Sequence, residues 1–72
     1  MPLTLMVNGA THVLDPAPAP ASLAAVVALV ANNPQLVVAE HHGVIAPRSR
    51  WDSILVKDDD TLEIVTIVGG GS

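Results

Sequence analysis

The feature that most constrains the fold is the dipeptide Asn8-Gly9, which separates two short runs of strand-like residues. In the run 3–7, every second residue is apolar, as expected for a strand with one buried face. A two-residue type I′ turn requires positive φ at both positions, and Asn followed by Gly satisfies this requirement. The sequence therefore predicts a β-hairpin with strands over residues 3–7 and 11–14.

One helix is expected after the proline-rich connector 15–20, because proline removes backbone donors and excludes helix and inner-strand structure. Ser22 is a favourable N-cap for the run that follows it, 23–31. Apolar residues recur there at helical spacing and predict one buried stripe, Leu23, Val26, Val27 and Val30. Asn32-Asn33-Pro34 should end the helix. A buried strand through the paired valines is the alternative.

The second half of the chain predicts three more strands, over residues 36–40, 44–45 and 62–68. His41-His42-Gly43 should form the turn between the first two of these strands. Residues 47–51 are too irregular for a strand and fit either a single helical turn or an extended loop. The last run is rich in β-branched residues and almost wholly apolar, which is typical of a central strand.

Two strands, one helix and three further strands predict an α+β fold with a mixed sheet packed on one helix. This arrangement is the β-grasp, or ubiquitin-like, architecture, with the last strand central beside the first. The strand order is an analogy with that architecture, since the sequence does not specify it. We expect one domain over residues 1–68 and a flexible glycine-rich tail over residues 69–72.

Composition excludes several classes of function. Three basic and seven acidic residues give a net charge of −4, which argues against binding nucleic acid. The absence of cysteine excludes disulfides and cysteine-ligated zinc, so apolar packing must hold this small core together. The longest apolar stretch, residues 23–31, is far short of the roughly 20 residues that span a bilayer. We therefore expect a cytoplasmic protein without membrane contacts.

Few side chains offer catalytic or metal-binding chemistry. His41 and His42 would point to opposite faces of a strand, and in a turn they could converge, but no third ligand is evident. We interpret them as polar turn residues. The run Asp58-Asp59-Asp60 is typical of a solvated turn, with a cation site as the alternative, and His12 should face solvent. No catalytic residue, metal site or bound cofactor is expected.

The remaining feature is the C-terminal run Gly69-Gly70-Gly71-Ser72. Glycines at a chain end pack poorly, but a strand without side chains can thread a narrow channel and present a terminal carboxylate to another protein's active site. A flexible linker, a cloning remnant or an ordinary frayed end are the alternatives.

Short motifs along the whole chain then suggest a family. They are Val7-Asn8-Gly9, Pro47-Arg48-Ser49 followed by Trp51, the acidic turn 58–60, Glu63-Ile64-Val65 and Val68-Gly69-Gly70-Gly71. In this order and at this length, the sequence resembles the ThiS family of thiamine-biosynthesis sulfur carriers. The Pro-Arg-Ser-x-Trp segment favours ThiS over its relative MoaD. The sequence departs from the family pattern in its proline-rich connector, in Asp59 where glycine is frequent, and in Ser72 after the last glycine.

The resemblance implies a cosubstrate rather than an enzyme. A ThiF-type adenylating enzyme would use ATP and magnesium to activate the carboxylate of Gly71, with Gly69 and Gly70 leading to it. A persulfide from a cysteine desulfurase or another donor would convert the acyl-adenylate to a thiocarboxylate. A ThiG-type thiazole synthase would then take up the sulfur. The carrier itself would bind no cofactor.

Several alternatives stay open. The carrier could serve molybdopterin synthesis, or the chain could be a ubiquitin-like modifier of lysines or an interaction domain with an inert tail. Ser72 is either removed before activation or a cloning remnant, or the tail is not used in this way.

The expected docking surface is the outer sheet face near the tail. Alternation places Glu63, Val65 and Ile67 on one face of the last strand and Leu62, Ile64, Thr66 and Val68 on the other. Which face meets the helix stays open at this point. Trp51, Arg48 and Arg50 fit either a structural role at the sheet edge and loop or a partner interface.

Overall fold

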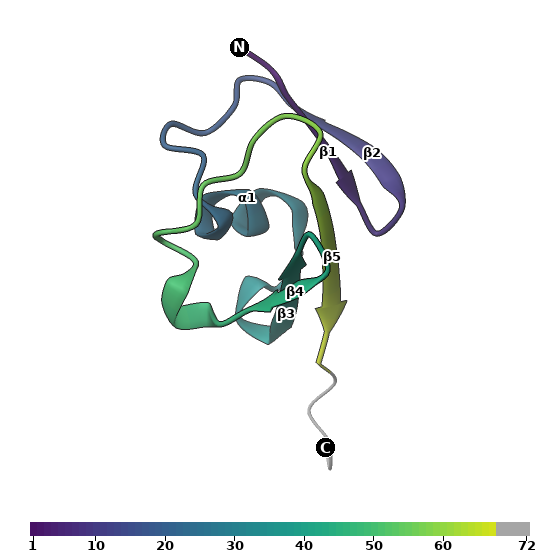
Figure 1. Cartoon of the computed structure of the whole chain (residues 1–72), viewed down its shortest axis with the longest axis vertical. Helices are drawn as coiled ribbons and strands as arrows, with labels where there is room; N and C mark the ends of the chain where they lie inside the picture. Colours follow the sequence, from purple (N-terminus) through teal and green to yellow (C-terminus); the bar gives the residue numbers. More distant parts are fainter. Residues whose placement is uncertain (68–72) are drawn as a thin grey trace.

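A computed structural model describes residues 1–67 and shows a five-stranded mixed sheet with one helix against one of its sides (Figure 1). The elements are β1 (Leu3–Val7), β2 (Ala10–Leu14), α1 (Leu23–Val30), β3 (Val37–His41), β4 (Val44–Ala46) and β5 (Thr61–Thr66). The strands lie in the order β2-β1-β5-β3-β4. Val68 and the tail 69–72 lie outside the described residues, so the predicted boundary between domain and tail stays a prediction.

The predicted N-terminal hairpin is confirmed. Asn8 and Gly9 have φ values of 52° and 81°, as a type I′ turn requires, and Val7 pairs with Ala10 across it. The first strand has the predicted bounds and the second begins one residue earlier. β5 pairs in parallel with β1 and antiparallel with β3, so the last strand is central, as the β-grasp architecture predicts.

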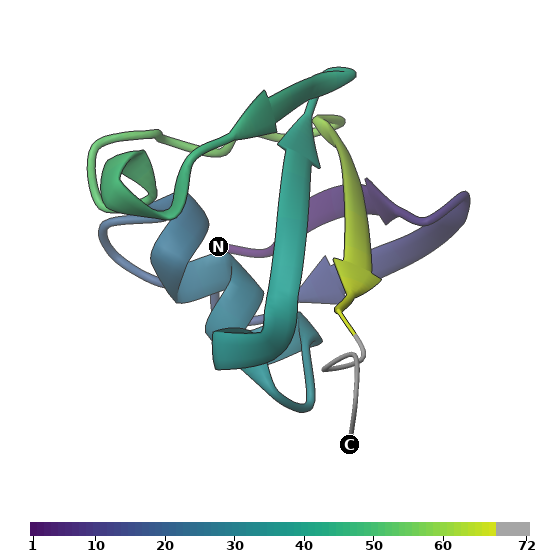
Figure 2. The same cartoon turned by 90° about the horizontal axis from the view of Figure 1, so that it is seen from below.

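The helix is confirmed, and the alternative of a buried strand is wrong. Ser22 caps it, since its hydroxyl accepts a hydrogen bond from the Ala25 amide at 3.1 Å. The helix ends at Val30, because Ala31 is already extended, slightly before the asparagines. Figure 2 shows α1 lying against one side of the strands. Three side chains of α1 are buried in the same core cluster as Leu5 and Leu62 of the sheet: Leu23, Val26 and Val27.

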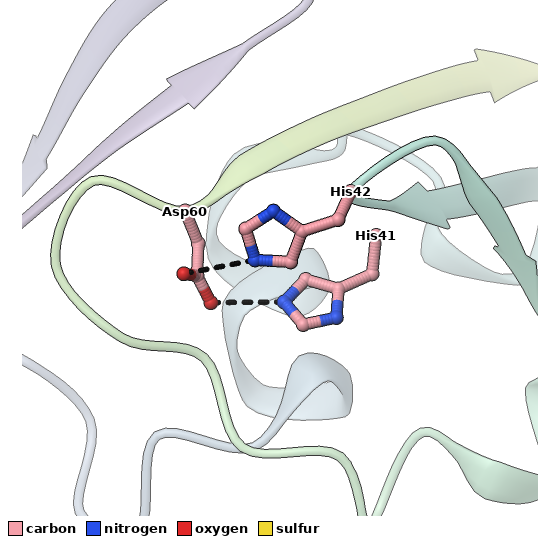
Figure 3. A group of neighbouring side chains, drawn as sticks. All are labelled: His41, His42 and Asp60. Carbon is pink, nitrogen blue, oxygen red and sulfur yellow. Dashed lines mark hydrogen bonds and ion pairs between the residues drawn. The ribbon is translucent and has the colours of Figure 1, made fainter.

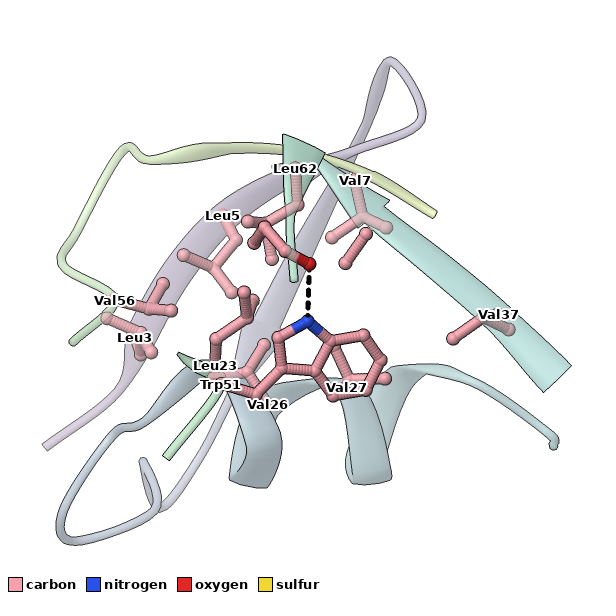
Figure 4. Close-up of a cluster of buried hydrophobic side chains, with 12 residues drawn as sticks. Leu3, Leu5, Val7, Leu23, Val26, Val27, Val37, Trp51, Val56 and Leu62 are labelled. Atoms are coloured by element: carbon pink, nitrogen blue, oxygen red, sulfur yellow. Dashed lines mark hydrogen bonds between the residues drawn. The ribbon is translucent and has the colours of Figure 1, made fainter. Parts of the chain in front are cut away.

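The irregular segment after β4 contains a single 3-10 turn, Arg48–Arg50, which was one of the two forms predicted. Trp51 follows it and is a core residue, only 5% exposed (Figure 4). The indole Nε1 donates a hydrogen bond to the buried carbonyl of Ala46 at 2.9 Å. The Arg48 guanidinium lies 4.4 Å from the indole centroid and donates to the Pro34 carbonyl. Trp51 and Arg48 therefore both have structural roles, Trp51 in the core rather than at the sheet edge and Arg48 on main-chain carbonyls rather than in solvent alone.

Strand boundaries in the second half of the chain shift from their predicted positions by one or two residues. β3 begins at Val37 because Pro34–Leu36 forms a 3-10 turn, with proline at its first position. β3 extends to His41, so only His42 and Gly43 make the following turn. β5 begins at Thr61 and ends at Thr66. Within residues 1–67, no helix is long and apolar enough to cross a membrane.

Candidate functional site

The end of β5 fixes where the chain leaves the sheet. β5 pairs with β1 at its start, at Thr61 and Leu62, and with β3 as far as Thr66. The Ile67 amide donates one further hydrogen bond to the Leu36 carbonyl at 2.6 Å. The predicted sulfur-acceptor residues Gly69, Gly70 and Gly71 lie outside the described residues. The structure therefore describes the base from which they extend.

Asn8 contributes to this base in a way that the hairpin motif did not predict. Its side-chain Oδ1 accepts a hydrogen bond from the Ile64 amide at 2.7 Å, and its Nδ2 donates to the Ile64 carbonyl at 3.0 Å. The Asn8 main-chain amide also donates to the Leu62 carbonyl at 2.9 Å. One carboxamide thus imitates a peptide group and continues the β1–β5 pairing toward the exit.

The orientation of β5 settles which face is exposed. Leu62 is fully buried under the helix side, so Glu63, Val65 and Ile67 point to the outer face. Val65 is 56% exposed and Ile67 53% exposed, close to the exit of the chain. Glu63 lies directly opposite Glu40 of β3 on the same face, which makes that part of the surface acidic. The outer face therefore combines an apolar area at the exit with a pair of carboxylates further back.

A second group of polar side chains, His41, His42 and Asp60, converges at the opposite end of β5 (Figure 3). The Nε2 atoms of His41 and His42 lie 2.8 Å and 3.0 Å from the two carboxylate oxygens of Asp60. The adjacent histidines share a side because His42 leaves the strand conformation, with φ of 54°. The chain around Asp60 is fixed by the Lys57 amide, which donates to Oδ2 at 2.9 Å.

Asp60 is consequently not the solvated turn residue that the acidic run predicted. Burial alone would raise the pKa of its carboxyl, but hydrogen bonds from His41 and the Lys57 amide and the charge of His42 outweigh that effect and lower the pKa. Asp58 is closer to the expectation, since its Oδ1 accepts a hydrogen bond from the Thr4 amide at 2.9 Å in an exposed turn. His12 lies opposite Leu5 and is partly buried, so it faces solvent only in part.

The third partner of the histidines was missed because no local pattern joins residue 41 to residue 60. The signal available in the sequence was the dipeptide His42-Gly43 between two strands. Histidine is one of the few residues enriched at positive φ, and Gly43 has φ of 78°. Because a hairpin turn interrupts the alternation of side chains along the strand, the His42 imidazole can lie on the same side as that of His41.

The strand order, the parallel pairing of β1 with β5, and the single helix on one side define a protein of the β-grasp, or ubiquitin-like, class. The family model of the ThiS family matches residues 5–71, and the chain belongs to that family. Its structure is similar to that of a thiamine biosynthesis protein, ThiS, from Geobacter metallireducens. The two share 30% identity with a TM-score of 0.78, over 96% of this chain and 100% of the other.

Among curated proteins, the chain is similar to the uncharacterized protein ycf40 of Trieres chinensis. The two are 44% identical over 39 residues, which is 54% of this chain. The match spans 53% of the ycf40 protein, so the chain corresponds to about half the length of that relative.

Proposed function

We propose that this protein is a sulfur carrier for thiamine biosynthesis, acting as a cosubstrate through Gly71, the last residue of its glycine run. The observation that carries the proposal is the similarity to the ThiS protein over almost the whole chain, with a glycine run following the central strand. The family membership supports the same role. Because the chain has no cysteine, it has no thiol on which a transferable sulfur could be carried as a persulfide, which favours the backbone terminus as the point of attachment.

The chemistry proposed for the terminus has three steps. In the form that ends at Gly71, which requires hydrolysis of the Gly71–Ser72 peptide bond, a carboxylate oxygen of Gly71 attacks the α-phosphate of magnesium-bound ATP on a ThiF-type enzyme, releasing pyrophosphate and leaving an acyl-adenylate. The terminal sulfur of a persulfide, from a cysteine desulfurase or another donor, displaces AMP. This displacement leaves an acyl disulfide between the carrier and the donor. A thiol then attacks the donor's sulfur, forms a disulfide with the donor and releases the carrier thiocarboxylate, which donates its sulfur to a thiazole synthase of the ThiG type.

The body of the protein would serve as a handle in these steps. The firmly paired β5 sets the starting point of the tail, and a glycine run offers no side chain that would obstruct a narrow channel. The exposed Val65 and Ile67 offer apolar contact next to that starting point. Glu40 and Glu63 add negative charge, so the complementary partner surface would be apolar with basic residues beside it.

Intact-mass measurement tests the proposal directly. The full chain and a chain ending at Gly71 are each incubated with a ThiF-type enzyme, ATP, magnesium, a persulfide donor and a thiol. The expected result is the mass gain of one oxygen-to-sulfur exchange on the glycine-ended form, and Gly71→Ala in that form should keep the fold but lose adenylation. Isopeptide-linked products would instead indicate a modifier, and no reaction of either form would contradict activation altogether.

The docking face has its own matched pair of variants. Val65→Asp places a charge beside the exit, whereas Val13→Asp places the same charge at an equally exposed position on β2, 57% exposed. We expect the first to raise the KM of the adenylating enzyme for the carrier clearly more than the second. Equal effects of both variants would exclude this part of the face as the contact.

A further inference from the structure

We propose that His41, His42 and Asp60 form a binding site for one divalent transition-metal cation, with Zn²⁺ as the representative ion. Each residue offers one ligand atom, and these three atoms lie within 4.8 Å of one another. The site consists of groups at the opposite end of β5 from the chain's exit, so the inference does not depend on the sulfur chemistry proposed above.

The ligand distances suit such an ion. Zinc holds nitrogen and oxygen ligands at about 2.0–2.2 Å, so tetrahedral neighbours lie about 3.3 Å apart. The Asp60 oxygens are 2.8 Å and 3.0 Å from the Nε2 atoms of His41 and His42. These contacts use both carboxylate oxygens, whereas a cation would bind one of them together with the two imidazole nitrogens. The three ligand atoms now lie within 4.8 Å of one another and would have to come to about 3.3 Å, a change of at most about 1.5 Å at the ends of side chains that already face one another.

The chemical character of the three groups selects the class of cation. Two imidazole nitrogens with one carboxylate are typical ligands for zinc and its neighbours in the first transition row, while Mg²⁺ and Ca²⁺ prefer oxygen ligands throughout. The Asp60 carboxylate is held by the Lys57 amide at 2.9 Å, so one ligand is already oriented by its surroundings.

The ligand group is open to solvent on one side, and the segments that carry it are joined by a main-chain hydrogen bond. The Asp60 side chain is 12% exposed and that of His41 22%, whereas His42 is 54% exposed, which leaves an open approach and a coordination position for water. The backbone already joins the same segments, since the His42 amide donates to the Thr61 carbonyl at 3.0 Å. A bound cation would therefore fasten the β3–β4 turn to the start of β5, in a chain without disulfides.

Calorimetric titration of the full chain with Zn²⁺, after chelator treatment and exchange into chelator-free buffer, tests the inference. We expect one equivalent to bind and the melting temperature to rise by about 10 °C or more at one hundred times the dissociation constant. Mg²⁺ at the same concentration should leave the melting temperature unchanged.

Two single variants assign the site. His42→Asn removes one ligand and keeps a residue that tolerates positive φ, so the turn should survive. It should weaken zinc affinity about tenfold or more, since even loss of a residue that only supports a ligand costs 10–100-fold. His12→Asn is the matched control on β2 and should leave the affinity unchanged.

Weakening by His42→Asn alone would support the assignment. Absence of zinc binding to the chelator-treated chain, or equal weakening by the two variants, would overturn it. Circular dichroism of both variants verifies the fold. Because the titration contains no activating enzyme, its outcome is separate from that of the thiocarboxylate experiment: a chain can fail either test and pass the other.

Discussion

Replacing Asn8 separates two roles that the structure gives to one side chain. The residue occupies a turn position with φ of 52°, and its carboxamide makes two hydrogen bonds to the main chain of Ile64. Asn8→Gly keeps the turn conformation accessible and removes only the carboxamide. Asn8→Ala removes the carboxamide and also places a residue with a Cβ atom in the left-handed region.

The structure sets the expected magnitudes. A hydrogen bond contributes about 0.5–1.5 kcal/mol net, and the two bonds of Asn8 lie in an exposed region, so Asn8→Gly should lower the free energy of unfolding by about 1–2 kcal/mol. The left-handed conformation adds about 1–2 kcal/mol for alanine. Asn8→Ala should therefore cost about 2–4 kcal/mol, a large part of the stability of so small a domain.

Urea unfolding followed by circular dichroism measures these differences, and each kcal/mol should lower the melting temperature by about 4–8 °C. Hydrogen exchange gives a local readout, because the Ile64 amide loses its acceptor in Asn8→Gly and should exchange faster than in the wild type. Asn8→Asp retains an acceptor for that amide but sets a carboxylate against the Ile64 carbonyl, and should be no more stable than Asn8→Gly. If Gly and Asp both matched the wild type in stability, Asn8 would serve the turn alone and the reasoning would be wrong.

Two further stability predictions follow from buried or capping hydrogen bonds. Trp51→Phe should destabilise the fold by about 2–4 kcal/mol, because the Ala46 carbonyl loses its donor in the core and a smaller ring leaves a void. Urea unfolding followed by far-UV circular dichroism measures this loss, and a value below about 1 kcal/mol would contradict the prediction. Ser22→Ala should cost about 1 kcal/mol by freeing the Ala25 amide at the start of α1, which thermal unfolding can detect, and an unchanged melting temperature would indicate that the cap contributes nothing.

The sequence predicted the elements whose determinants are local. Asn8-Gly9 specifies its turn, Ser22 marks the helix start, and the β-branched run identifies β5, because each signal depends on residues a few positions apart. Which face of β5 is buried could not be decided in advance, because almost every side chain on it is apolar. Leu62 is fully buried only because α1 and the neighbouring strands cover that side.

The groups that matter most for a site were the least predictable. In the sequence, Asp60 is one of three equivalent carboxylates, yet it alone among them is buried and lies between two histidines. The contact requires the β3–β4 turn and the start of β5 to meet, and this follows from strand order rather than from spacing along the chain. A pattern search that tests residues near one another in sequence therefore finds the histidine pair and misses its partner.

The two ends of β5 differ in the chemical groups found beside them. At the start of the strand, side chains supply imidazole and carboxylate groups that are held by tertiary contacts. Beyond its end, the sequence continues with a glycine run that has no functional side chains, so the activation proposed for it depends on a partner enzyme. The six residues of β5 separate these regions by about 20 Å. Because β5 is paired with β1 and β3, the variant His42→Asn should leave the end of the strand in place. We therefore expect sulfur transfer by this variant to match the wild type, and a loss of transfer would show that the histidine group and the exit of the chain are coupled.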